Sequence, residues 1–323
     1  MTQFSYHISH EQFPPGELLR LVRRAEAAGF EGAFSSDHLQ PWARVQGQSG
    51  FAWAWLGAAL QATERLNFGV ISVPGGWRYN PVVLAQAIAT LGQMFPGRLP
   101  WVALGSGQAM NEAVTGQPWP DKAERHARLR EGADIIRRLL AGETVTHRGR
   151  VSVIGGHIWS RPDQATRLVG AATSEATAEW VGSWADGLLT VGTQPAALRP
   201  IIEAFRRGGG QGKPIYLKMD LCWAASEEEA LRQAHEQWRF NALGGDVNWE
   251  LRSPAHFELA ARFVRPEDMR ETVLVSSDPS RYAERIAECA EIGFESIDLH
   301  NVGTDQDAFI QVFGEQVLPS LTR

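Results

Sequence analysis

The chain has 323 residues, 44% of them hydrophobic, and a formal net charge of −6 at pH 7. This composition can bury a large core, and the even spread of Lys and Arg argues against nucleic acid as a partner. No apolar run reaches the roughly 20 residues of a membrane span, no signal core opens the chain, and two cysteines are too few for a disulfide framework. We therefore expect a soluble, cytoplasmic protein with no membrane or nucleic-acid partner.

Strand-type and helix-type runs alternate from the N-terminus onward. In the first half the sequence predicts strands at residues 4–9, 32–36, 67–72 and 99–105, and helices at residues 17–28, 51–62, 81–95 and 122–140. The first helix illustrates the pattern, because Leu18, Leu21 and Val22 recur at helical spacing and Gly29 follows as a stop signal.

The second half repeats this alternation. It predicts strands at residues 167–172, 187–191, 214–223 and 296–300, and helices at residues 175–184, 196–207, 227–240, 280–292 and 305–321. Eight strands that alternate with helices favour a parallel (β/α)₈ TIM barrel over a doubly wound sheet. We expect residues 1–323 to form a single barrel domain with two insertions. Residues 144–162 read as a hairpin around a glycine, and residues 241–272 as a lid or substrate-facing segment.

In such a barrel the reactive side chains come from the loops that follow the strands. Asp37 and His38 follow the second strand, where they could perform acid–base chemistry or serve as a cap and a structural hydrogen bonder. The Gly105-Ser106-Gly107 run allows close approach of a planar ligand or forms an ordinary turn. Ser174 and Thr177 begin a helix, where they could bind a phosphate or cap the helix. The residues alone leave these alternatives open.

Three motifs occur in order along the chain. Residues 36–42 read Ser-Asp-His-Leu-Gln-Pro-Trp, residues 78–81 read Arg-Tyr-Asn-Pro, and residues 105–116 carry Gly-x-Gly-x-Ala-x-Asn-Glu-x-x-Thr-Gly. Together they resemble the bacterial luciferase-like flavin oxidoreductase family, closest to the branch of the coenzyme F420-dependent glucose-6-phosphate dehydrogenases. The resemblance covers essentially the whole chain.

The resemblance implies a role for each segment. His38 would be the acid–base group with Asp37 beside the cofactor ring, and Trp42 would lie on the substrate side. Ser72 and Val73 match a non-proline cis peptide beneath the ring. The remaining cofactor-binding positions are Ser106, Gly107, Gln108 and Asn111 in one loop, and Ala171, Ala172, Ser174 and Thr177 at the phosphate site. Family members commonly pair, so we also expect a homodimer.

Two departures from that branch bear on the cofactor and the substrate. Gln108 stands where the F420-dependent dehydrogenases carry a Glu, and a Gln cannot donate a proton to a reduced cofactor. Residues 190–194 contain no lysine, although the hexose-phosphate enzymes use one there for the sugar phosphate. We therefore expect FMN as cofactor, with coenzyme F420 as the alternative, and a small organic substrate other than glucose 6-phosphate.

The reaction expected is hydride transfer, or monooxygenation by reduced FMN and O₂, with Gln108 as a hydrogen-bond partner of the ring. A non-catalytic flavin-binding protein is a second hypothesis, which the loss of the Glu favours and the Asp37-His38 pair opposes. A third is a metal-dependent hydrolase that uses His7, His38, His300 and Asp298. No ligand spacing matches a known metal site, so we infer no metal.

Overall fold

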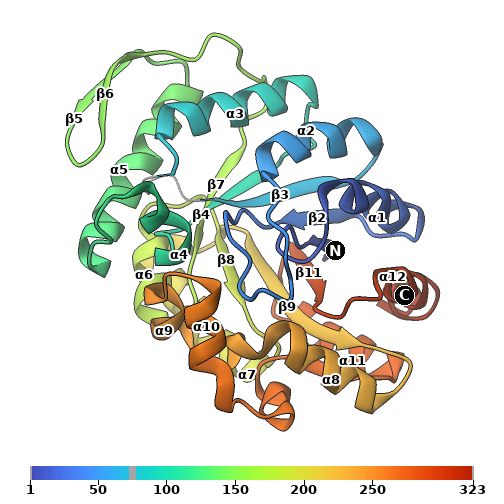
Figure 1. Cartoon of the computed structure of the whole chain (residues 1–323). Coiled ribbons are helices and arrows are strands. Elements are labelled where there is room, and N and C mark those ends of the chain that lie inside the picture. Colours follow the sequence, from blue (N-terminus) through green and yellow to red (C-terminus); the bar gives the residue numbers. More distant parts are fainter. Residues whose placement is uncertain (1, 73–77, 322–323) are drawn as a thin grey trace.

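Eight parallel strands close into a barrel in the computed structural model, which describes residues 2–72 and 78–321 (Figure 1). In sheet order they are β9 (Ile215–Trp223), β11 (Ser296–Asn301), β1 (Gln3–Ile8), β2 (Gly32–Ser35), β3 (Asn67–Ser72), β4 (Trp101–Leu104), β7 (Arg167–Ala171) and β8 (Leu188–Val191). The barrel closes because β8 also pairs with β9. The predicted (β/α)₈ TIM barrel is confirmed.

Helices surround the strands and bury their apolar stripes against them (Figure 1). They are α1 (Pro15–Ala27), α2 (Ala52–Ala62), α3 (Pro81–Met94), α5 (Lys122–Leu140), α6 (Glu175–Gly182), α7 (Pro195–Phe205), α8 (Glu227–Trp238), α11 (Pro279–Ala290), α12 (Gln306–Val312) and α13 (Leu318–Leu321), with π-helical turns η2 (Arg206–Gly210) after α7 and η6 (Phe313–Val317) after α12. In α1 the predicted Leu18, Leu21 and Val22 are all buried. No helix among the described residues is long and apolar enough to cross a membrane.

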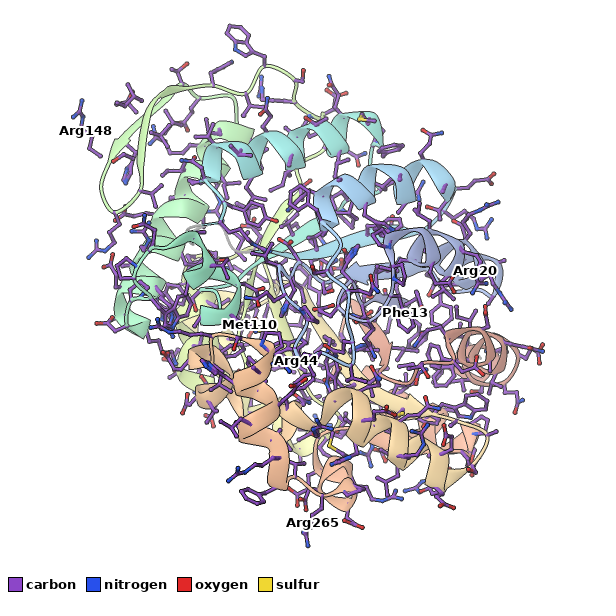
Figure 2. All side chains as sticks on the ribbon, viewed as in Figure 1. Phe13, Arg20, Arg44, Met110, Arg148 and Arg265 are labelled. Atoms are coloured by element: carbon purple, nitrogen blue, oxygen red, sulfur yellow. The ribbon has the colours of Figure 1, made fainter. Side chains whose placement is uncertain are left out.

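The first predicted insertion is a hairpin, as expected, formed by β5 (Val145–Arg148) and β6 (Ser152–Gly156). The second is a cluster of short helices: η3 (Arg239–Leu243), α9 (Gly245–Glu250), α10 (Pro254–Ala260), η4 (Ala261–Phe263) and η5 (Pro266–Glu271). Figure 2 shows Arg148 and Arg265 on the outer parts of these two segments, pointing away from the barrel.

Three further elements are absent from the sequence prediction: α4 (Ala109–Glu112), η1 (Ala113–Thr115) and β10 (Leu274–Ser276), which extends the sheet beside β9. Each spans only three or four residues. A periodic pattern needs more residues than that to stand out.

The barrel lumen and the insertion each have an apolar core. The lumen core consists of Phe34, Trp101, Ala103, Val169, Leu189 and Tyr216. A second cluster lies under the insertion and includes Met110, Cys222, Trp238, Phe240 and Phe257. This second cluster joins α4 and α8 to the insertion, so residues 241–272 pack as an ordered layer beside the mouth of the barrel (Figure 1).

Candidate active site

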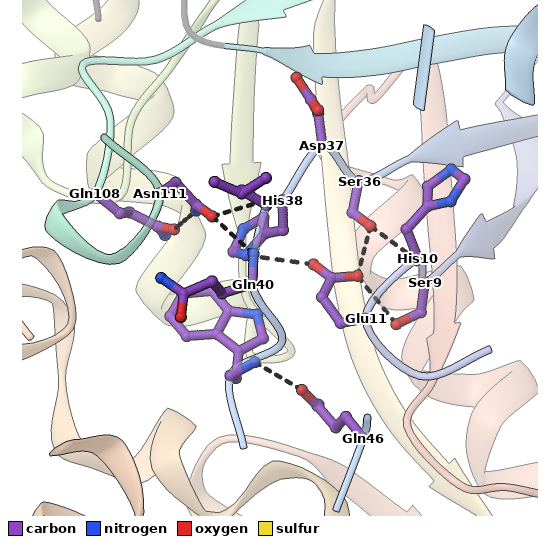
Figure 3. Close-up of polar contacts among 12 residues, drawn as sticks. Ser9, His10, Glu11, Ser36, Asp37, His38, Gln40, Gln46, Gln108 and Asn111 are labelled. Carbon is purple, nitrogen blue, oxygen red and sulfur yellow. Dashed lines mark hydrogen bonds and ion pairs between the residues drawn. The ribbon is translucent and has the colours of Figure 1, made fainter. Parts of the chain in front are cut away.

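His38 and Glu11 meet at the carboxyl edge of β1 and β2 (Figure 3). Nδ1 of His38 lies 3.6 Å from Oε1 of Glu11. The hydroxyl of Ser36 donates a hydrogen bond of 2.6 Å to Oε2 of Glu11, and the hydroxyl of Ser9 donates one of 3.3 Å to the same atom. The loop after the first strand therefore supplies a carboxylate to the predicted histidine, and the sequence analysis missed this residue.

The pair has a defined protonation preference. Burial lowers the pKa of His38, and the Glu11 carboxylate offsets part of that effect. Burial alone would raise the pKa of Glu11, but His38 and the Ser36 hydroxyl hold it below its usual value. At neutral pH the site therefore holds an uncharged imidazole beside an ionised carboxylate, which suits a general base.

Trp42 lies against His38, with their ring centroids 4.8 Å apart. On its other side it stacks on Phe240 at 5.3 Å, with an interplanar angle of 11°, and meets the edge of Phe257 at 5.2 Å. Both phenylalanines belong to the cluster under the insertion. The insertion thus fixes an aromatic wall next to His38.

The Asp37 carboxylate is bound by two neighbouring side chains of the protein. Its Oδ1 accepts a hydrogen bond of 2.9 Å from the hydroxyl of Tyr79, and its Oδ2 lies 3.0 Å from Nη2 of Arg78. The backbone N–H of Arg78 donates to Oε2 of Glu112 at 3.0 Å. The Arg-Tyr-Asn-Pro motif therefore holds Asp37 in place, and these contacts support a positioning role more than proton transfer.

Asn111 joins the loop after β2 to the loop after β4 (Figure 3). Its Oδ1 accepts hydrogen bonds from the backbone N–H groups of Leu39 and Gln40, at 2.9 and 3.4 Å. Its Nδ2 must then be the donor to Oε1 of Gln108, at 3.0 Å. This arrangement fixes the orientation of the Gln108 amide, so Nε2 is the group that Gln108 can offer to a ligand.

The other predicted cofactor positions also follow strand ends. Gly107 has φ of +87°, a conformation that favours glycine, and it stands next to Ser106. Ser174 occupies the N-cap of α6 without capping it, and its hydroxyl instead donates to Oγ1 of Thr177 at 3.1 Å. The Ser174 side chain therefore does not cap α6, and its hydrogen bond with Thr177 lies at the exposed surface.

Two further predicted positions lie just before that helix, and the remaining two are Ser72 and Val73. Ala171 ends β7, and Ala172 donates its N–H to the carbonyl of Leu189. Ser72 ends β3, but Val73 and hence the predicted cis peptide lie outside the described residues.

Comparison with known proteins identifies the family. A family model described as luciferase-like monooxygenase matches residues 1–296. The chain belongs to this family. It is 36% identical to an F420-dependent glucose-6-phosphate dehydrogenase of Beutenbergia cavernae, over 99% of this chain and 98% of the relative. A second relative of the same description, from Microbacterium testaceum, is 34% identical with the same coverage.

Among solved structures, an F420-dependent secondary alcohol dehydrogenase in complex with an F420-acetone adduct is similar to the chain, with a TM-score of 0.90 and 29% identity over 99% of both chains. The protein is thus a luciferase-like oxidoreductase, as its motifs predicted. The relatives are named for F420, not for the FMN that the sequence analysis put first.

This luciferase-like barrel also contains a second set of titratable side chains, inside the lumen. Nδ1 of His7 on β1 lies 2.6 Å from Oδ2 of Asp298 on β11. Nδ1 of His300 lies 2.7 Å from Oδ1 of Asp220 on β9, which also forms an ion pair with Lys218. The two imidazole rings are 4.0 Å apart. The sequence analysis noticed only His7, His300 and Asp298, and did so as candidate metal ligands.

Burial controls the charges of this lumen cluster. It lowers the pKa of His7 well below its usual value, lowers that of His300 to about 4, and raises that of Asp298 well above its usual value. Burial would also raise the pKa of Asp220, but Lys218 and His300 hold it below its usual value. Within residues 2–72 and 78–321 no group of three or more His, Cys, Asp or Glu side chains is arranged to hold a metal ion.

Two cavities lie away from His38. One of about 480 Å³ opens at the amino ends of the strands, beside Gln3, Asn67 and Arg167. Because barrel enzymes place their chemistry at the opposite edge, we do not assign the reaction to this cavity. The other, of about 420 Å³, lies between the start of α5 and α9.

Proposed function

We propose that the protein is a coenzyme F420-dependent dehydrogenase that oxidises a hydroxyl group of a small organic substrate. The full-length relationship to enzymes named for F420 supports this cofactor over FMN. The observation that carries the proposal is the position of His38, held between Glu11 and Trp42 on the loop that Asn111 ties to Gln108.

The residues present fit such a cofactor. Gly107 leaves room for a ring because it has no side chain, and the Gln108 amide can donate to a ring oxygen or nitrogen. The Ser174 and Thr177 hydroxyls, together with the free N–H groups of the first turn of α6, suit a phosphate. When bound, F420 supplies the acceptor for the hydride that leaves the substrate carbon.

The protein would supply the base and the enclosure. His38, uncharged at neutral pH, would take the proton of the substrate hydroxyl, and the nearby Glu11 carboxylate would stabilise the imidazolium that forms. Trp42 and the aromatic rings behind it would cover one side of the substrate and exclude water. Asp37, held by Arg78 and Tyr79, would fix the loop that carries His38.

FMN remains a second candidate because of one specific residue. Gln108 presents amide N–H groups, not a carboxyl, and so offers no proton to a reduced deazaflavin. A flavin that reacts with O₂ would not need that proton.

Reconstitution tests both candidates. The purified protein is titrated with F420 and with FMN, and binding is followed by fluorescence. We expect F420 to bind with a dissociation constant below about 100 μM and its absorbance to fall on addition of simple secondary alcohols. If only FMN binds, the second candidate replaces the first. If neither binds, both are wrong. Binding of F420 without reduction by any alcohol would favour the non-catalytic hypothesis.

A further inference from the structure

Three glutamines meet between the barrel mouth and the beginning of the insertion. They are Gln12 in the loop after β1, Gln46 in the loop after β2, and Gln237 near the end of α8, and all three are buried. The insertion begins directly after α8. Because a buried amide needs hydrogen-bond partners, the contacts of these side chains show which segments they hold together.

Gln12 holds the loop that carries Glu11. Its Nε2 donates hydrogen bonds to the carbonyl of Val302 at 2.8 Å and to Oε1 of Gln237 at 3.3 Å. Since a backbone carbonyl can only accept, the atom of Gln12 that faces Val302 must be the amide nitrogen. Gln12 directly follows Glu11 in the chain, so these bonds fix the loop of the carboxylate against α8 and against the loop after β11.

Gln46 holds the loop that carries His38 and Trp42. Its Oε1 accepts hydrogen bonds from the backbone N–H groups of Trp42 at 2.9 Å and Ala43 at 3.4 Å (Figure 3 shows Gln46 below the histidine). Its Nε2 donates to the backbone carbonyl of Gln237 at 3.1 Å. Both ends of the Gln46 amide are therefore satisfied in one orientation.

Gln237 receives the two loops through different oxygens. Its side-chain oxygen accepts from Gln12, and its backbone oxygen accepts from Gln46. Three residues later Phe240 stacks on Trp42, with ring centroids 5.3 Å apart. One residue at the end of α8 thus places the loop of the carboxylate and the loop of the imidazole relative to each other.

Such a contact matters because Glu11 and His38 do not bond directly. Nδ1 of His38 and Oε1 of Glu11 are 3.6 Å apart, which is beyond a hydrogen bond. Ser36 and Ser9 bind the other oxygen of the carboxylate, Oε2, and the backbone next to it is held by Gln12. The effect of one charge on a neighbour falls with distance, so a displaced loop would change the protonation of His38.

The groups that act on His38 come from several elements. Burial has the largest effect and lowers the pKa of His38, Glu11 and Asp37 raise it, and Arg78 lowers it. His38 in turn acts on His7 in the lumen, whose pKa it lowers. Among these groups only Glu11 belongs to the loop that Gln12 holds. Movement of that loop would therefore reach His38 chiefly through Glu11.

We propose that Gln12, Gln46 and Gln237 form a glutamine clamp that keeps the Glu11 carboxylate beside His38 and the Trp42 ring over it. The three glutamines are positioning residues, because they act through these neighbours. Their part in catalysis rests on the proposed function, in which His38 takes the proton of the substrate hydroxyl. The clamp itself can be tested in the protein without cofactor.

NMR titration of the histidine rings measures the pKa of His38 in the ligand-free protein, and His38→Ala identifies its signal. Gln12→Met keeps a side chain of similar length but removes both hydrogen bonds, so the carboxylate can move away from His38. We expect the pKa of His38 to fall by about half a unit, toward its value in Glu11→Gln. Gln237→Met removes only the longer of the two bonds and should give a smaller fall.

Gln46→Met should have the opposite effect. It releases the backbone of Trp42, so water gains access to His38, and weaker burial raises the pKa of the imidazole. Gln233→Met is the matched control. Gln233 is buried one turn earlier on α8 and accepts the N–H of Thr304 at 2.9 Å, so it holds the loop after β11 and should leave the pKa of His38 unchanged.

The sign of the change separates a clamp from general loosening. Loosening would raise the pKa of a buried histidine toward its usual value in every variant. A rise or no change in Gln12→Met, or an equal change in Gln233→Met, would overturn the inference. Gln12→Met and Gln237→Met break the same contact from opposite sides, so a folded protein from either one decides the test.

Turnover adds a second measurement. A displacement of about 1 Å can cost up to about 10²-fold in rate, and we expect Gln12→Met to lower kcat with F420 and an alcohol about ten-fold, with F420 affinity within about two-fold of the wild type. Wild-type kcat in a variant with a shifted pKa of His38 would overturn the catalytic part of the inference. Absence of F420 turnover in the wild type would contradict the proposed function, and the NMR titration would still decide whether the clamp exists.

Discussion

Two kinds of histidine–carboxylate pair occur in this barrel, one at the mouth and one in the lumen. At the mouth, His38 and Glu11 are 3.6 Å apart and 14% of the His38 side chain is exposed. In the lumen, His7 and Asp298 are 2.6 Å apart and only 3% of the His7 side chain is exposed.

The same residue types can therefore play different roles at these two places. Nδ1 of His38 is close to a carboxylate but beyond hydrogen-bond distance, and part of the His38 ring is exposed at the mouth, where a ligand can reach it. The lumen histidines are buried and hydrogen-bonded to carboxyl groups, so their role is structural. Access to ligand, more than residue type, separates a candidate catalytic group from a structural one.

The largest effect should come from removing the histidine at the mouth. His38→Ala should reduce turnover with F420 by about 10²–10⁴-fold, the usual contribution of a general base, and leave cofactor affinity nearly unchanged. Steady-state kinetics and a fluorescence titration measure the two quantities. His157→Ala in the segment after β6 is the matched control. Wild-type turnover in His38→Ala would mean that another group accepts the proton.

The lumen cluster should instead affect stability. Lys218→Met leaves the buried Asp220 without its cation, which should lower the free energy of unfolding by about 3–5 kcal/mol. Arg207→Met, which breaks an ion pair with Glu179 between two side chains more than half exposed, should cost less than about 1 kcal/mol. Urea denaturation followed by circular dichroism measures both. Equal stability of the two variants would contradict the structural role of the lumen pair.

Glu11→Gln should change the pH dependence at the mouth. The Glu11 carboxylate raises the pKa of His38, and burial lowers it. Loss of that carboxylate therefore lowers the pKa further, and the acid limb of the kcat/KM profile should move to lower pH by up to about one unit. The control is Glu236→Gln on the exposed surface of α8. A shift of the acid limb to higher pH would show that the Glu11 carboxylate does not raise the pKa of His38.

The smallest effect is expected from Gln108→Glu. The new carboxylate can still accept the hydrogen bond from Asn111 and adds a group that can donate a proton. We expect turnover with F420 to rise by less than about ten-fold and the profile to gain a basic limb, as seen in kcat against pH. A profile identical to that of the wild type would indicate that residue 108 does not contact the reacting groups.

Much of the fold could be read from the chain because the signals are local. Leu18, Leu21 and Val22 recur along one helical face, and the buried strand runs are continuous. The loops at the barrel mouth follow from the same argument, since a loop after a parallel strand must lie at that edge. Short elements such as α4 and β10 carried no comparable signal.

The pairing of polar side chains could not be predicted from local signals in the same way. Glu11 meets His38 across 27 positions, and Asn111 meets the backbone of Leu39 across 72. One signal for the lumen cluster does exist in the sequence. Lys218 and Asp220 stand two residues apart in an otherwise apolar strand, and only three of the 31 basic residues in the chain are lysines. Two charges on one face of a buried strand predict an internal ion pair.

The sequence by itself determined the (β/α)₈ barrel, the family and the segments that form the mouth, because periodicity and motif spacing are properties of neighbouring residues. Only the tertiary structure decided that Glu11 stands beside His38, that Asp37 is held by Arg78 and Tyr79, and that the amide oxygen of Gln108 accepts a hydrogen bond from Asn111. These outcomes depend on how the strands close into a ring and bring distant loops within hydrogen-bond distance. No local pattern along the chain encodes that closure.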